Sequence, residues 1–463
     1  MTDKFEEQGG AATMDPSSLR RWLTSALISR MLKPQRLLKK RATLERQRCK
    51  SGAAHRVEFF YQLDDPYSHL AAQLLNPMLE RYDIELVCYL VNGPSGTNNG
   101  QPELLAKYSR YDASRIAPNY GLLFPEMQSD NSLENLATAI LAAQNSSGFI
   151  NCVAQVGQAY WAGDKQVLES LAAEYGCDAD NVAGRLRAGN TRREKLGHYA
   201  GAMFYYAGEW YWGIDRLHYL ETRLQELGAE YKTERTLLAP RPKIECGALK
   251  DNGSLQLEVY VSLRSPYTAI IFDRAVRLAK ETGVELVVRP VLPMVMRGVP
   301  VTREKGLYIF ADTVREALTA GVAFGQFYDP VGEPARRCYS LYPWACEQCK
   351  GIELLSSFLS CAFAEGVNTN THKGLKQVIK KAGLDWLEAQ NLMGQQDWQA
   401  ILEDNRQALY DAGLWGVPSF RLIDKSANKS SEQILALWGQ DRLWLIAREI
   451  ESRLANNNGG NHA

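Results

Sequence analysis

The stretch Leu257–Pro290, LEVYVSLRSPYTAIIFDRAVRLAKETGVELVVRP, has a counterpart earlier in the chain at Val57–Leu90, VEFFYQLDDPYSHLAAQLLNPMLERYDIELVCYL. The two stretches align without a gap, and each residue of Leu257–Pro290 lies 200 positions after its match in Val57–Leu90. Pro66-Tyr67, for example, matches Pro266-Tyr267. A gapless match of this length indicates an internal repeat, and therefore two domains built on one plan.

Each copy predicts a β-α-β unit. An apolar run rich in β-branched and aromatic residues precedes a Pro-Tyr pair, an amphipathic helix and a second apolar run. Two strands joined by such a helix are expected to be parallel. Ser265 then lies at the carboxyl end of the first strand and at the amino end of the helix. Open α/β sheets bind ligands at that place, and the helix dipole there favours a negative charge.

The rest of the chain predicts an α/β protein with two similar halves. With 463 residues and 45% apolar side chains, the chain is long enough for two or more globular domains. In each half a long helical insertion separates the β-α-β unit from a later β-β-α unit, and Trp212–Leu217 matches Trp438–Leu443. The predicted segments are a basic N-terminal extension with one amphipathic helix over residues 1–56, a first domain over 57–232, a linker over 233–253, a second domain over 254–454 and a disordered tail over 455–463.

Charge is balanced over the whole chain but not along it. Lys+Arg and Asp+Glu both total 53, which gives no electrostatic indication of a nucleic-acid partner. The segment from Arg20 to Arg56 nevertheless contains twelve Lys or Arg residues against Glu45 alone. Within it, Leu19, Trp22, Leu23, Ala26 and Leu27 share one face of a predicted helix. Two interpretations stay open: peripheral contact with a membrane or another acidic partner, or packing on the protein's own acidic body.

The chain predicts a cytoplasmic protein. No segment approaches the roughly twenty apolar residues of a membrane span, and the N-terminus lacks the apolar core of a signal peptide. Nine cysteines, an odd number without an export signal, favour reduced thiols over a disulfide framework.

Three motifs carry a resemblance to a known family: Ser265-Pro266-Tyr267, Gly416-Val417-Pro418, and the segment that begins at Trp438. In this order and spacing they resemble the DsbA-like group of the thioredoxin fold, which contains 2-hydroxychromene-2-carboxylate isomerases and kappa-class glutathione transferases. The likeness spans the second domain and, more weakly, the first. It implies two tandem thioredoxin-like domains, each with an inserted helical subdomain.

The resemblance also implies a glutathione site in the second domain. Ser265 would be the catalytic serine that hydrogen-bonds the glutathione sulfur, with Pro266 and Tyr267 beside the cofactor. A cis Pro418 would present the backbone of Val417 to the cysteinyl part of glutathione. The residues that would bind the γ-glutamyl end are Gln440 and Asp441.

The residue types alone allow simpler roles. Serine and aspartate both favour helix N-caps, so Ser265 and Asp441 are also candidates for caps. Pro418 is also compatible with a trans bond at the start of an edge strand.

The first domain departs from the family pattern. Asp65 replaces the serine, and a carboxylate beside a thiolate raises the thiol pKa instead of lowering it. Met203 stands where we expect the proline, and a cis bond before a non-proline residue costs about 3 kcal/mol. We therefore expect the first domain to keep the fold and to lack the chemistry.

The other candidate groups are weaker. Cys346 and Cys349 form a C-x-x-C pair that suggests redox chemistry or, with Cys338, a zinc site. The pair lies inside the helical insertion without a second ligand pair, and Ser265 and Thr268 occupy the positions of a thioredoxin-fold dithiol. We therefore expect no metal site. The aromatic runs at 204–206 and 210–212 are expected to fill the core and not to stack on nucleobases, so no nucleic-acid partner is predicted.

The predicted function is a glutathione-dependent isomerase or transferase of the 2-hydroxychromene-2-carboxylate isomerase type. It would act on a small molecule, possibly of aromatic origin, through a glutathione thiolate stabilised by Ser265. The alternatives are a non-catalytic binding or scaffold protein with the same fold and a thiol-disulfide oxidoreductase that uses Cys346 and Cys349.

Overall fold

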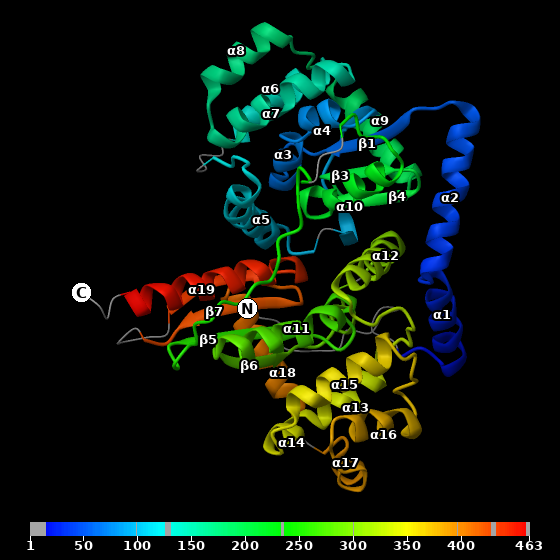
Figure 1. Cartoon of the computed structure of the whole chain (residues 1–463), viewed down its shortest axis with the longest axis vertical. Helices are drawn as coiled ribbons and strands as arrows, with labels where there is room; N and C mark the ends of the chain where they lie inside the picture. Colours follow the sequence, from blue (N-terminus) through cyan, green and yellow to red (C-terminus); the bar gives the residue numbers. More distant parts are fainter. Residues whose placement is uncertain are drawn as a thin grey trace. The chain divides into compact units, whose positions relative to one another are not determined.

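The computed structural model describes residues 15–459, apart from residues 99, 126–130, 233–235, 300, 396 and 427–431. The chain forms two compact units (Figure 1). The C-terminal unit comprises Met1–Arg36 together with Pro242–Ala463, and the N-terminal unit comprises Leu37–Arg241. Each unit contains one four-stranded mixed sheet.

The sheet of the N-terminal unit has the strand order β2-β1-β3-β4. Its strands are β1 (His55–Tyr61), β2 (Ile84–Leu90), β3 (Met203–Tyr206) and β4 (Glu209–Trp212). The β1–β2 pair is parallel, and the other two pairs are antiparallel. Between β2 and β3 lie the helices α5 (Pro102–Ile116), α6 (Glu134–Ala142), α7 (Ser146–Ala162), α8 (Lys165–Tyr175) and α9 (Val182–Lys195). Helix α10 (Gly213–Glu226) follows the sheet.

The sheet of the C-terminal unit has the equivalent order β6-β5-β7-β8. Its strands are β5 (Leu255–Val261), β6 (Glu285–Pro290), β7 (Ser419–Asp424) and β8 (Glu432–Trp438). Between β6 and β7 lie α12 (Arg303–Ala320), α13 (Glu333–Ser340), α14 (Tyr342–Glu347), α15 (Gly351–Phe363), α16 (His372–Lys381), α17 (Trp386–Leu392) and α18 (Trp398–Asp411). Helix α19 (Leu443–Gly459) closes the unit.

The two parallel strand pairs have the same register. Val57 pairs with Leu86, and Leu257 pairs with Leu286, so the offset of 200 positions is kept in the hydrogen-bond ladder. The central strands β1 and β5 are buried along nearly their whole length, as expected of a strand with a neighbour on each side and both faces covered. The predicted parallel β-α-β units are confirmed in both units.

The connection between the parallel strands differs between the units. In the C-terminal unit it is one helix, α11 (Pro266–Thr282), as predicted. In the N-terminal unit the predicted single helix is wrong, because α3 (Pro66–Ala72) ends before α4 (Leu75–Arg81) begins. Pro77 explains the break: it has no N–H to donate to the carbonyl of Gln73, and its ring would clash with that carbonyl. The equivalent position in α11 is Arg277.

The predicted N-terminal extension contains two helices and not one: α1 (Ser18–Met31) and α2 (Pro34–Ser51). Pro34 separates them, as the first residue of the second helix. Helix α2 contacts the N-terminal unit, where the guanidinium of Arg41 donates two hydrogen bonds of 2.7 Å to the carboxylate of Glu209. Helix α1 contacts the C-terminal unit.

The two other predicted boundary segments differ in outcome. The described residues of the predicted linker, 233–253, contain no helix or strand, although the carboxylate of Glu221 accepts hydrogen bonds from the N–H groups of Leu238 and Ala239. Disorder from residue 455 onward is wrong for 455–459, because α19 continues to Gly459. Residues 460–463 lie outside the described part. Among the described helices, none is long and apolar enough to cross a membrane.

Candidate functional site

Ser265 lies where the sequence predicts it, at the start of α11. Its hydroxyl accepts a hydrogen bond of 3.1 Å from the N–H of Thr268, so it caps the helix. The same oxygen lies 3.4 Å from the carbonyl oxygen of Val417, to which it donates. Ser265 and Val417 are both half-buried. Ser265 therefore caps α11, and its hydroxyl also faces the segment that leads into β7.

Val417 and Pro418 form that segment. The bond between them is cis, as predicted. The N–H of Gly439 donates a hydrogen bond of 2.9 Å to the carbonyl of Pro418, which joins the segment to the end of β8. A Cβ atom on Gly416 would overlap the indole of Trp438, so the close approach of this backbone to the indole needs glycine. The structure thus brings Ser265, Val417 and Pro418 together from two distant parts of the chain.

Gln440 and Asp441 form the short 3₁₀ helix η5 (Gln440–Arg442), which directly precedes α19. Helix η5 contacts α11. Gln440 is 3% exposed, and its amide nitrogen donates a hydrogen bond of 2.7 Å to the buried carboxylate of Glu316. Asp441 is half-buried. A contact of either side chain with glutathione stays a prediction.

Tyr267 has a partner within the protein. Its hydroxyl donates a hydrogen bond of 2.8 Å to the carboxylate of Asp312 in α12. The same carboxylate accepts a hydrogen bond of 2.6 Å from the guanidinium of Arg315. In the N-terminal unit Tyr67 donates in the same way, at 2.8 Å, to Asp112. Because both units contain this pair at the same offset, it stabilises the packing of the inserted helices on the first helix of each unit.

One ion pair beside the site was not predicted. The guanidinium of Arg264 donates two hydrogen bonds, of 3.0 and 3.2 Å, to the carboxylate of Asp329. Arg264 directly precedes Ser265, so this pair ties the backbone at the start of α11 to the segment before α13. Asp329 lies 65 positions along the chain, and no local pattern in the sequence indicates the pairing.

The matching position in the N-terminal unit is filled by its own side chains. Asp65 caps α3, and its carboxylate accepts hydrogen bonds from the N–H of Tyr67 at 3.2 Å and from the hydroxyl of Ser68 at 2.9 Å. Burial raises the pKa of Asp65 to about 7. The Ser68 hydroxyl also accepts a hydrogen bond of 2.8 Å from the N–H of Ala202. The polar groups of Asp65, Ser68 and Ala202 therefore have hydrogen-bond partners within the protein.

The strand register corrects the prediction for Met203. Phe60 pairs with Met203, whereas Tyr260 pairs with Ser419. Met203 is therefore equivalent to Ser419, and Ala202, with a φ of 53°, is equivalent to Pro418. The departure from the family pattern remains, because Ala202 is not a proline, but it lies one residue earlier than predicted.

The hydrogen bonding of Thr268 differs from that of Ser68 partly because Pro418 stands in place of Ala202. Thr268 occupies the position of Ser68, is fully buried, and its hydroxyl has no hydrogen-bond partner among the described residues. In the N-terminal unit the Ser68 hydroxyl is satisfied in part by the N–H of Ala202. Pro418 has no N–H, so that donor is missing in the C-terminal unit. An unpaired buried hydroxyl therefore lies one helical turn from Ser265.

Cys346 lies in the last turn of α14 and Cys349 lies between α14 and α15, and the N–H of Cys349 donates a hydrogen bond of 2.9 Å to the carbonyl of Cys346. Partial burial raises the pKa of Cys346, which disfavours the thiolate that redox chemistry needs. All nine cysteines are described, and each is a free thiol. The described residues contain no group of three or more His, Cys, Asp or Glu side chains able to hold a metal ion.

Comparison with known proteins identifies the fold of this half of the chain. Residues 256–451 match the model of the DSBA-like thioredoxin domain family. This range contains nearly all of β5, all of β6, β7 and β8, and Ser265, Val417 and Pro418. The C-terminal unit therefore has a DsbA-like thioredoxin fold. A comparison with curated proteins found no match.

Three solved structures are similar at low identity. A probable DsbA oxidoreductase from Streptomyces coelicolor is 18% identical, with 43% of this chain and 89% of that chain covered and a TM-score of 0.34. A 2-hydroxychromene-2-carboxylate isomerase is 16% identical, with 45% and 100% covered and a TM-score of 0.35. The cytosolic disulfide reductase DsbM from Pseudomonas aeruginosa, solved with GSH, is 15% identical, with 44% and 98% covered and a TM-score of 0.32. Values this low carry no information on activity.

Proposed function

We propose that the C-terminal unit binds glutathione beside Ser265 and uses its thiolate in an isomerase or transferase reaction. The observation that carries this proposal is the approach of the Ser265 hydroxyl to within 3.4 Å of the Val417 carbonyl, at the amino end of α11 and next to the cis Val417–Pro418 bond. A hydroxyl donor and the first turn of a helix both stabilise a thiolate and lower its pKa. The family match over 256–451 supports the same placement.

Ser265 and Thr268 favour glutathione over a protein dithiol. A disulfide oxidoreductase needs a thiol at the start of the first helix, and both positions have hydroxyl side chains here. A hydroxyl forms no disulfide, but it can donate a hydrogen bond to the sulfur of a bound thiol.

The chemistry follows from the thiolate. In an isomerase, the sulfur adds to a carbon–carbon double bond conjugated to a carbonyl, and the electron pair of the double bond moves to the carbonyl oxygen. The former double bond then rotates, the electrons return, and the thiolate leaves, so the reaction has no net oxidation. In a transferase, the same thiolate attacks an electrophile, the carbon–sulfur bond stays, and a leaving group departs. In both reactions Ser265 would hold the sulfur as an anion.

We also propose that the N-terminal unit is a second DsbA-like domain that lacks this site. Its strand order, parallel register and helix cap all match those of the C-terminal unit. Asp65 and Ala202 replace the serine and the proline, and in its ionised form the Asp65 carboxylate would repel a thiolate. One glutathione per chain is therefore the expected stoichiometry.

Isothermal titration of glutathione into the full chain tests the proposal. We expect one saturable site that weakens about tenfold or more in Ser265→Ala and in Pro418→Ala, because the first removes the hydroxyl proposed to hold the sulfur and the second alters the backbone segment proposed to face the cysteinyl part. Thr371→Ala is the matched control: Thr371 caps α16 in the same unit by accepting 3.0 Å from Gly374, so this variant loses a helix cap away from the site.

The ultraviolet absorbance of the bound thiolate, followed against pH, separates chemistry from binding. Ser265→Ala should raise the pKa of the bound thiol, whereas Thr371→Ala should leave it unchanged. If folded wild-type protein shows no saturable binding at millimolar glutathione, the enzyme proposal is wrong and a non-catalytic binding protein becomes the better explanation. Two equivalent sites per chain would contradict the proposed loss of the site in the N-terminal unit.

A further inference from the structure

Helix α1 exposes its apolar face. Leu19 and Leu27 are each 66% exposed, Trp22 is 54%, Leu23 is 45% and Met31 is 39% exposed. These five residues, together with Ala26, have the i, i+3, i+4, i+7, i+8, i+12 spacing of one helical face, and we call them the α1 stripe. In a surface helix of a globular protein this face normally covers the core. Here it faces away from the unit on which the helix is docked.

The opposite face of α1 is polar and docked. Arg21, Ser25 and Ser29, spaced four residues apart, meet the extended segment 327–331 of the C-terminal unit. Ser29 exchanges two hydrogen bonds with the backbone of Phe327, at 2.8 and 2.9 Å, and Ser25 accepts 3.0 Å from the N–H of Asp329. Arg21 is 1% exposed and donates to the carbonyls of Asp329 at 2.6 Å and Val331 at 2.7 Å.

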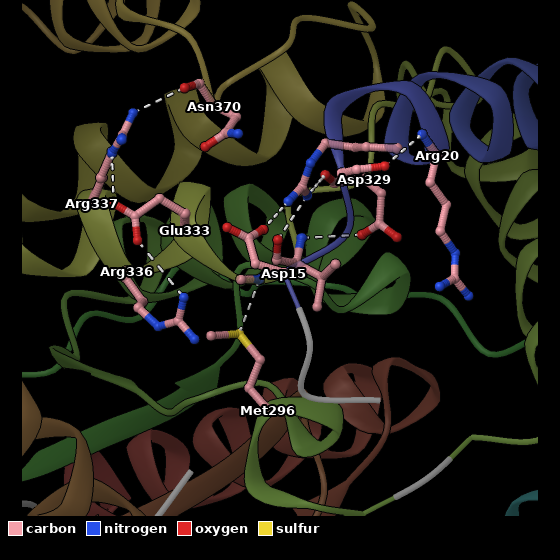
Figure 2. Close-up of polar contacts among 12 residues, drawn as sticks. Asp15, Arg20, Met296, Asp329, Glu333, Arg336, Arg337 and Asn370 are labelled. Atoms are coloured by element: carbon pink, nitrogen blue, oxygen red, sulfur yellow. Dashed lines mark hydrogen bonds and ion pairs between the residues drawn. The ribbon is translucent and has the colours of Figure 1, made fainter. Parts of the chain in front are cut away.

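The geometry of this contact explains its regularity. Four residues of helix advance about 6 Å, and successive side chains at this spacing meet successive parts of the segment: Ser29 meets Phe327, Ser25 meets Asp329, and Arg21 meets Asp329 and Val331. Arg21 also pairs with Asp15. Figure 2 shows Asp15 and Asp329 at this contact, with the side chain of Arg20 directed away from it. The hydrogen bonds therefore set the orientation of α1 and keep the stripe outward.

The charge around the α1 stripe has one sign. Arg20, Arg30, Lys33 and Arg36 are all exposed, and the sequence from Pro16 to Leu44 contains no Asp or Glu. A surface that combines leucines and a tryptophan with exposed arginines matches the interface of an anionic bilayer. There the apolar side chains enter the acyl boundary, and the cations remain among the phosphates.

We propose that α1 is a membrane-surface helix that attaches the C-terminal unit to anionic lipid through the α1 stripe. The contact with 327–331 stays intact during binding, because it uses the opposite face. A second copy of this chain fits less well: the stripe exposes on the order of 500 Å², below the roughly 800 Å² that each partner contributes to a standard protein interface. Four exposed cations facing their own copies would also repel one another.

Vesicle co-sedimentation of the full chain tests the proposal. We expect binding to vesicles that contain phosphatidylglycerol, little binding to pure phosphatidylcholine, and weaker binding at high salt. The double variant Leu19→Gln with Leu27→Gln should lower the partition coefficient about tenfold or more. Leu318→Gln with Leu387→Gln is the matched control, because these leucines of α12 and α17 are 71% and 69% exposed and lie outside α1.

A charge variant and sedimentation velocity complete the test. Arg20→Gln with Arg30→Gln should reduce the preference for phosphatidylglycerol, since both arginines border the stripe. Equal loss of binding in the α1 variant and in the Leu318 and Leu387 control would overturn the proposal, as would equal binding to neutral and anionic vesicles. If the wild type sediments as a dimer without lipid and the Leu19 and Leu27 variant as a monomer, the stripe is a self-association face instead.

Discussion

Replacing Arg21 by methionine should release α1 from the C-terminal unit. Methionine fills a similar volume, but it cannot donate to the carbonyls of Asp329 and Val331 or pair with Asp15. A hydrogen bond from a charged donor contributes about 1.5 to 3 kcal/mol, and breaking a buried ionic contact costs about 3 to 5 kcal/mol. We therefore expect the contact between α1 and residues 327–331 to lose about 4 kcal/mol.

Hydrogen exchange measures this loss at the right place. The N–H groups of Phe327 and Asp329 donate to Ser29 and Ser25 of α1, so their exchange rates report whether the helix is docked. A loss of about 4 kcal/mol corresponds to exchange that is faster by up to about 1,000-fold, with about 100-fold as the lower expectation if α1 re-forms other contacts.

Arg20→Met is the control, because Arg20 is the neighbouring arginine and its side chain points away from this contact (Figure 2). It should change the exchange of the two amides by less than about threefold. If Arg21→Met and Arg20→Met have the same effect, Arg21 does not hold α1 in place, and the explanation for the outward stripe fails.

Two further predictions concern the positions that differ between the units. Asp65→Asn should abolish a pH dependence: burial raises the pKa of Asp65 to about 7, so the native state binds a proton that the unfolded chain releases near its ordinary pKa, and stability falls as the pH rises from about 4 to about 7. Because Asp65 is only half-buried as a residue, we expect this fall in stability to be about 2 kcal/mol, measured by hydrogen exchange in β1. If the stability of the wild type and of Asp65→Asn depends on pH in the same way between about pH 4 and about pH 7, Asp65 is not protonated in the native state. Thr268→Val should leave stability unchanged or raise it by about 1 kcal/mol, because it removes an unpaired hydroxyl, whereas Ser68→Ala should lower it by about 2 kcal/mol, because it breaks a satisfied network. Comparable losses in urea unfolding for the two variants would show that the Thr268 hydroxyl has a partner.

The features that the sequence predicted correctly depend on short-range patterns. The gapless repeat predicted the parallel pairs because both strands and the helix between them lie within about 35 residues, where periodicity and turn signals are reliable. The same holds for the Pro-Tyr helix start at Ser265. The two helices of the N-terminal copy were missed although Pro77 is visible in the sequence, because the likeness to Leu257–Pro290 outweighed the local signal of a helix break.

The features that the sequence did not predict depend on distant partners. A pattern of leucines shows which residues of α1 share a face, but not which face the protein covers. That choice depends on the fit of Arg21, Ser25 and Ser29 to the backbone of 327–331, about 300 positions away. The pair of Arg264 with Asp329 is hidden for the same reason. Contacts of this kind join a side chain to a backbone whose position only the fold determines.

Two replacements account for much of the difference between the two helix ends. In the N-terminal unit Ala202 has an N–H, which donates to Ser68; Ser68 in turn donates to Asp65, and the chain of hydrogen bonds is closed without a ligand. In the C-terminal unit Pro418 lacks the N–H and Ser265 stands in place of the Asp65 carboxylate, so the hydroxyl of Thr268 is unpaired and Ser265 faces Val417. The buried hydroxyl of Thr268 therefore has neither the donor nor the acceptor that Ser68 has in the N-terminal unit. The same scaffold therefore has one helix end that is satisfied by its own side chains and one, at Ser265, where we propose that the thiolate of glutathione binds.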